Sequence, residues 1–158
     1  MKHLTQFITE YIVKKKLGKP IDSISKHDYF PKTREELIDI IKGLLNKGET
    51  NLNCIDTSKI TDMSKLFYNK EDINIDVSKW NVSNVEDMNC MFFGCKLFDC
   101  DLSKWDVSNV EFMYTMFEGC NKFEGKGLEN WNVSKVKYTK EMFDGCTSLK
   151  NKPTWYKE

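Results

Sequence analysis

The sequence lacks the features of a membrane-spanning, secreted or nucleic-acid-binding chain. Lys, Asp or Asn interrupts every apolar run well before it reaches the length that crosses a bilayer. The N-terminal stretch alternates charged and apolar side chains, unlike a signal peptide, so we expect a cytoplasmic protein with no membrane partner. Lys plus Arg and Asp plus Glu both number 24, so no net field attracts a polyanion. We expect nucleic acid to be reached only through a protein complex.

Histidine and catalytic motifs are also scarce. The chain has two histidines, His3 and His27, both among the first 50 residues. Three of the six cysteines, Cys90, Cys95 and Cys100, are spaced by five, which matches no common zinc pattern. No Gly-rich phosphate loop and no nucleophile elbow occurs. We therefore expect no catalytic residues, no cofactor, no metal site and no enzymatic activity.

What the chain does contain is a repeat of about 25 residues. The copies read DVSKWNVSNVEDMNCMFFGCKLFDC, DLSKWDVSNVEFMYTMFEGCNKFEGKG and LENWNVSKVKYTKEMFDGCTSL. A degenerate repeat, NLNCIDTSKITDMSKLF, precedes them. Equivalent residues form columns, which include Trp80, Trp105 and Trp131; Phe67, Phe92, Phe117 and Phe143; and Cys95, Cys120 and Cys146. Leucine-rich-type solenoids have periods in this range. The sequence predicts an α/β fold, a leucine-rich-repeat-like solenoid of about four 25-residue repeats.

Each repeat divides into two predicted parts. Val85, Met88, Phe92 and Cys95 have helical spacing, which predicts a short helix that ends at Gly94, and an extended arm follows from Phe98. The Trp column could be a ligand-stacking platform, but equal spacing in every repeat favours packing in the core. The same argument predicts that the Cys column consists of buried free thiols.

The regions outside the repeats are predicted to close the two ends. Apolar spacing predicts an amphipathic helix from Leu4 to Lys16 and a second helix over 34–46, with Thr33 as N-cap and Gly48 after its end. We expect residues 1–50 to form a helical N-terminal cap, 51–150 the repeat solenoid and 151–158 a C-terminal lid. Trp155 falls out of register with the Trp column, so the lid is expected to fold over the last repeat.

The repeats resemble those of the BspA-like leucine-rich repeat family, also described as mycoplasma-lipoprotein-type repeats. The resemblance covers about 51–149 and depends on Trp-Asn-Val-Ser-Asn-Val from Trp80 to Val85, followed by Met88, Met91-Phe92 and Gly94-Cys95. It implies binding of other proteins, because many members are bacterial surface adhesins, and it implies no shared catalytic residues. The helical N-terminal part and the Pro-x-Trp-Tyr ending are similar to those of short phage or mobile-element members.

These observations predict a non-enzymatic protein-protein interaction module. We expect an intracellular phage or mobile-element protein, in the host cytoplasm, that binds and inhibits a host defence protein. A bacterial surface adhesin and a virion or assembly component are the alternatives. Partner contact is expected at aromatic side chains that lie off the core columns: Tyr68, Phe93, Phe112, Tyr114 and Tyr138. Some of them could instead pack against neighbouring repeats.

Overall fold

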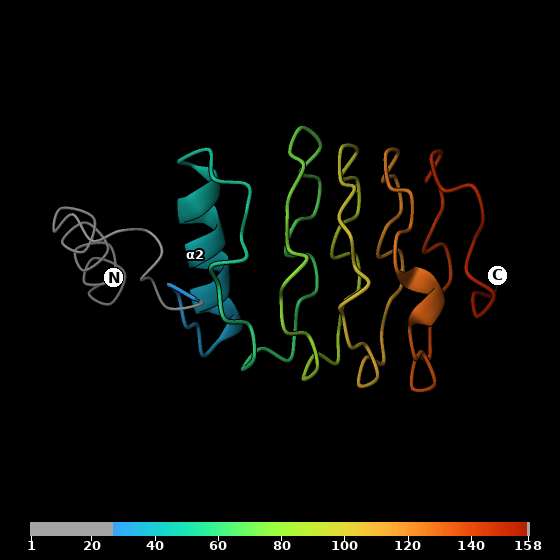
Figure 1. Ribbon diagram of the computed structural model, residues 1–158, viewed down its shortest axis with the longest axis horizontal. Coiled ribbons are helices and arrows are strands. Elements are labelled where there is room, and N and C mark those ends of the chain that lie inside the picture. The colour runs from blue at the N-terminus through green and yellow to red at the C-terminus, as the bar shows by residue number, and fades with distance from the viewer. Residues whose placement is uncertain (1–26, 158) are drawn as a thin grey trace, which may run out of the picture.

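The computed structural model describes residues 27–157, in which successive flat turns of the chain lie side by side along one axis (Figure 1). We call this arrangement the stack. Each turn has two long sides that enclose the core. The first side, here the Met segment, spans 61–69, 86–94, 111–119 and 137–145. The second side, the Trp segment, spans 73–82, 98–107, 123–133 and 149–157.

The turns are joined by backbone hydrogen bonds between Met segments. Alternate N–H groups of each of the first three Met segments donate to carbonyl groups one turn further along, as in Met88 N–H to Phe112 O at 2.9 Å and Phe92 N–H to Met116 O at 2.9 Å. Other N–H groups turn back by three residues within the same turn, as in Met91 N–H to Met88 O at 3.2 Å. Residues 27–157 therefore contain isolated parallel bridges but no sheet.

The predicted α/β solenoid is wrong, because the repeats contain neither the short helix nor the extended strand. The described elements are one α-helix, α2 (Arg34–Leu45), and one 3₁₀ helix, η2 (Leu128–Asn130). Each Met segment has two residues with positive φ, for example Cys90 at 54° and Gly94 at 70°. A left-handed residue every fourth position prevents continuous right-handed helix. In this non-helical conformation the Met and Phe side chains still point into one core, so their spacing does not require a helix.

The columns predicted from the sequence form the core. The rings of the Phe column stack face to face, with centroids 5.5, 5.7 and 5.9 Å apart from Phe67 to Phe143. The Trp column is buried, which confirms packing in place of an exposed platform. Each indole also donates Nε1–H to a carbonyl of the preceding turn, as Trp80 does to Leu52 O at 2.9 Å. A buried indole N–H is therefore satisfied in every turn.

Trp155 corrects a second expectation, because it continues the Trp column. Its ring stacks on Trp131 at 6.2 Å and 11°, and its Nε1–H donates to Leu128 O at 2.7 Å. Next to it, Tyr156 lies edge-on against Phe143, with ring centroids 5.1 Å apart. The prediction assumed a constant period and placed Trp155 outside the column. It was wrong because the last turn is shorter than the one before it.

Helix α2 covers the N-terminal end of the stack (Figure 1) and buries Leu37, Ile41 and Leu44. The predicted N-cap is confirmed, because Thr33 Oγ1 accepts from Glu36 N–H at 3.2 Å. The helix begins and ends within one residue of its predicted bounds. The expected cap of two helices is not found among residues 27–157, where α2 is the one α-helix. The other expected helix, from Leu4 to Lys16, lies outside the described residues.

Gly127, in the insertion between the third and fourth turns, provides a test of how closely turns approach. It has φ +89°, and a Cβ placed there would lie 2.3 Å from Ser103 Cα in the preceding turn. We expect Gly127→Ala to lower the free energy of unfolding by about 1–3 kcal/mol or more, measured by urea denaturation, because backbone must move.

The matched control is Gly43→Ala in α2. No atom lies within 4 Å of its added Cβ, so helix propensity should raise stability by about 0.5–1 kcal/mol. Equal effects of the two substitutions would contradict the close approach at Gly127.

Candidate protein-interaction face

The aromatic side chains predicted to bind a partner all lie on the outward side of the Met segments. We call this surface the aromatic face. Its tyrosines Tyr68, Tyr114 and Tyr138 are 43%, 42% and 61% exposed, respectively. Phe93 and Phe112 are half-buried, each against a ring in a neighbouring turn. The structure thus brings the five residues to one surface, with part of each phenylalanine packed between turns.

Four of the rings form two stacked pairs. Tyr68 and Phe93 have ring centroids 4.8 Å apart and planes 8° apart, and Phe112 and Tyr138 have centroids 6.2 Å apart and planes 12° apart. The backbone sets this arrangement, because Phe112 and Tyr138 form one of the parallel bridges. The pairs occupy different columns and different turns, so aromatic surface runs diagonally over the face.

Tyr114 lies between the two pairs and is held by hydrogen bonds at both ends. Its OH donates to Glu141 Oε2 at 2.9 Å, and its backbone N–H donates to Asn89 Oδ1 at 2.8 Å. The bond to Glu141 raises the pKa of Tyr114 and lowers the pKa of Glu141. Tyr114 is therefore a neutral phenol at pH 7, with its ring fixed at the surface.

Phe112 has a basic neighbour that the sequence did not single out. Lys137 Nζ lies 5.3 Å from the Phe112 ring centroid and 2.6 Å from Glu111 Oε2. Both contacts join the third turn to the fourth, where equivalent positions are adjacent. An alignment of the repeats could have revealed the Glu111–Lys137 pair, because it places the two residues in one column.

Phe112 and Tyr138 replace residues that stabilise the turn. In the same column, Asp62 Oδ1 accepts from Ser64 N–H at 2.8 Å, and Asp87 Oδ1 accepts from Asn89 N–H at 2.8 Å. These are Asx turns, which need a short side chain with an acceptor. An aromatic ring cannot make this bond. An exposed ring, Tyr138, and a half-buried one, Phe112, therefore occupy positions where local folding favours aspartate.

Acidic side chains border the aromatic face at both ends. Glu118 follows Phe93 in its column, and partial burial, together with the charges of Glu141 and Asp144, raises the pKa of its carboxyl. The other end carries Asp62 and Asp87. The rings thus run diagonally between two acidic regions of the face, one around Glu118 and one around Asp87.

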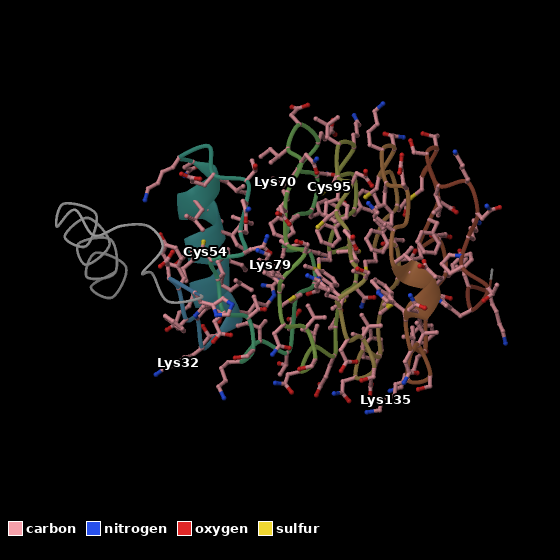
Figure 2. All side chains as sticks on the ribbon, in the orientation of Figure 1. Lys32, Cys54, Lys70, Lys79, Cys95 and Lys135 are labelled. Atoms are coloured by element: carbon pink, nitrogen blue, oxygen red, sulfur yellow. The ribbon has the colours of Figure 1, made fainter. Side chains whose placement is uncertain are left out.

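A second surface feature is a polar groove of ≈ 410 Å³ at the corner where the turns reverse into the Met segments. Its lining includes Thr61, Asn84, Glu86, Asn109 and Lys135, and Figure 2 shows Lys135 at this corner. Asn109 Nδ2 donates to Ser83 O at 2.7 Å, so an asparagine side chain bridges adjacent turns there. Within residues 27–157, no group of His, Cys, Asp and Glu could hold a metal ion.

The Cys column lies inside the stack, as predicted. Each thiol donates to a carbonyl of the Phe column one turn back: Cys95 Sγ to Phe67 O at 2.9 Å, Cys120 Sγ to Phe92 O at 3.0 Å and Cys146 Sγ to Phe117 O at 3.0 Å. Burial raises the pKa of Cys95 and Cys146 to about 12 and also raises that of Cys120. These thiols are hydrogen-bond donors of the core.

The fold and the face define a class of repeat protein whose turns of about 25 residues are joined by backbone bonds and closed at one end by a helix. Residues 38–156 match the model of a family described as Mycoplasma protein of unknown function, DUF285. This match spans most of the sequence, and the chain belongs to that family. No curated protein and no solved structure matches the chain. Among the described residues, no helix has the length and apolar character needed to cross a membrane.

The Cys column predicts a specific loss of stability at alkaline pH. Because the folded-state pKa exceeds the ordinary value of 9.0, the thiols favour folding fully below pH 9 and lose this contribution as pH rises toward 12. Each thiol should add up to about 1.4 kcal/mol per pH unit to the slope of unfolding free energy in that range. Denaturant melts of the wild type and of Cys95→Ala from pH 7 to 11 measure the difference.

Thiol labelling provides the control for that experiment. At pH 8, the half-exposed Cys54 should react with a thiol reagent well before Cys95, Cys120 and Cys146. Rapid labelling of the three column thiols in the folded protein would contradict their burial.

Proposed function

We propose that this chain is a non-enzymatic protein-binding module that contacts its partner through the aromatic face. The observation that carries this proposal is the exposure of Tyr68, Tyr114 and Tyr138, at 42–61%, on one side of neighbouring turns. Tyrosine rings are among the residues that contribute most to protein interfaces, because they bury a large area with few rotatable bonds.

The rigidity of the face also supports binding. Stacking holds Tyr68 against Phe93, and a hydrogen bond holds Tyr114 against Glu141, so less side-chain entropy is lost when a partner docks. Local folding gives no reason for rings at Phe112 and Tyr138, where an aspartate would complete the turn. A binding role supplies a reason for their presence at the surface.

We further propose that the partner is a host protein, which this chain binds and inhibits. The proposal rests on the resemblance of the repeats to short phage or mobile-element members of a repeat family with protein-binding relatives. The acidic regions of the aromatic face, around Asp87 and Glu118, favour a partner surface with basic groups beside an apolar centre.

The aromatic face can be tested with Tyr68→Ala and Tyr138→Ala. Affinity capture from the native host, followed by mass spectrometry, would identify proteins retained by the wild type. Each substitution should weaken binding of the true partner about 30-fold, since an interface anchor contributes about 2 kcal/mol or more. The free energy of unfolding should fall by only about 0.5–1.5 kcal/mol, because each exposed ring loses one stacked partner.

Leu97→Ala is the matched control, because Leu97 is 42% exposed and lies outside the Met segments. It should leave the affinity unchanged. The aromatic face is not the contact surface if Leu97→Ala weakens binding as much as the tyrosine variants do, or if both tyrosine variants bind fully.

A further inference from the structure

The last Met segment has a row of backbone donors without acceptors. One turn earlier, the N–H groups of Met113, Thr115, Phe117 and Gly119 donate to the fourth turn at 3.2, 3.3, 3.0 and 2.7 Å. The equivalent groups in the fourth turn belong to Thr139, Glu141, Phe143 and Gly145. None of these four N–H groups has an acceptor among residues 27–157. We call this row the donor edge.

The opposite end of the stack is closed differently. There the first Met segment presents carbonyl groups, and α2 lies over it (Figure 1). The Arg34 guanidinium donates through Nη2 to Ser64 O, and its Nε lies 3.3 Å from Asp62 Oδ2. A positively charged side chain on a helix thus binds one carbonyl of this edge.

At the C-terminal end, side chains are covered but the donor edge is not. Trp155 stacks on Trp131, and Tyr156 lies edge-on against Phe143, which leaves Phe143 only 3% exposed. Neither residue supplies an acceptor to the four N–H groups, and the carbonyl of Lys157 accepts from the side-chain Oγ1 of Thr139 at 3.3 Å, not from its N–H. Gly145 is exposed and Glu141 half-buried, so part of the edge reaches solvent. Unpaired N–H groups arranged in a row are a template for pairing with another chain.

The direction of the hydrogen bonds limits what can pair with this edge. A second copy cannot pair through its own donor edge, because donors would face donors. Its carbonyl edge is covered by α2. The matching surface is a segment in the conformation of a Met segment, with its carbonyls directed at the four N–H groups, as in every junction inside the stack.

Side chains specify this segment further. Inside the stack, Gly145 has φ +75° and a Cβ on it would lie 3.3 Å from Gly119 Cα, so glycine is favoured at the same place in a segment docked on the fourth turn. Cys146 Sγ donates to Phe117 O at 3.0 Å, whereas Phe143 O accepts from Cys146 N–H at 3.1 Å but from no thiol among residues 27–157. A Phe-x-Gly-Cys sequence provides the glycine and the thiol at these positions, and its phenylalanine ring takes the place on Phe143 that Tyr156 occupies in the free protein.

We propose that the donor edge binds, in parallel register, a Met-x-x-Met-Phe-x-Gly-Cys-type segment supplied by another repeat-containing chain that lacks a helix over its first turn, and that the phenylalanine of this segment displaces Tyr156 from the Phe143 ring. The bound segment continues the turn-to-turn interface already present three times in this protein. The interaction uses backbone groups of residues 139–145, so it does not depend on the aromatic face.

The test uses ¹⁵N-labelled protein and an unlabelled peptide that copies residues 108–121, SNVEFMYTMFEGCN. In the free protein, the amides of Thr139, Glu141, Phe143 and Gly145 should exchange about 100-fold or more faster than those of Met113, Thr115, Phe117 and Gly119. Adding the peptide should shift the resonances of the four edge amides and slow their exchange.

The control peptide carries Gly119→Val, which places a branched side chain where a Cβ meets backbone and φ is +75°. It should leave the four resonances unchanged. Three results would overturn the proposal: slow exchange of the edge amides in the free protein, no change with the copied peptide, or equal changes with both peptides. Tyr68→Ala should bind the copied peptide normally, which separates this proposal from the function of the aromatic face.

Discussion

The rest of the structure depends on the row of hydrogen bonds that each Met segment donates to the next. With four N–H groups in each of the first three segments directed at the following turn, the backbone cannot also form helix, and it must turn back at regular intervals. Left-handed residues such as Cys90 and Gly94 make those reversals possible. The same bonds place equivalent residues of successive turns one above another. Columns of identical side chains then follow from the backbone.

The columns account for what the sequence could predict. Repeated Phe, Trp and Cys at one spacing indicated a continuous core, and they are buried. Helix α2 was also predictable, because Thr33 and an apolar face are local signals. The backbone conformation of the repeats was not predictable, because the Met and Phe spacing fits the short helix that was expected as well as it fits the non-helical turn that is found. Positive φ at Cys90 and Thr115 had no signal in residue type.

The aromatic face was partly predictable for a related reason. Comparing repeats shows where they disagree, and positions such as Asp87, Phe112 and Tyr138 disagree in one column. The comparison does not show that Phe112 packs against Tyr138 or that Glu141 holds Tyr114, because those contacts depend on the distance between turns. The register predicted for Trp155 was wrong because it assumed a constant spacing between turns. Its place in the column is fixed by stacking on Trp131, which tolerates a shorter turn.

The direction of the Met-segment bonds also makes the two ends of the stack chemically different. One end presents carbonyl oxygens, which attract a cation, and Arg34 on α2 is the group found there. The other end presents N–H groups, which need acceptors, and the rings of Trp155 and Tyr156 cannot provide them. Closing the hydrophobic core and closing the backbone are therefore separate problems in this fold. The buried aliphatic side chains of α2 close the core at the N-terminal end, and Trp155 and Tyr156 close it at the C-terminal end. Among residues 27–157, backbone groups are covered at the N-terminal end alone, where Arg34 of α2 donates to Ser64 O.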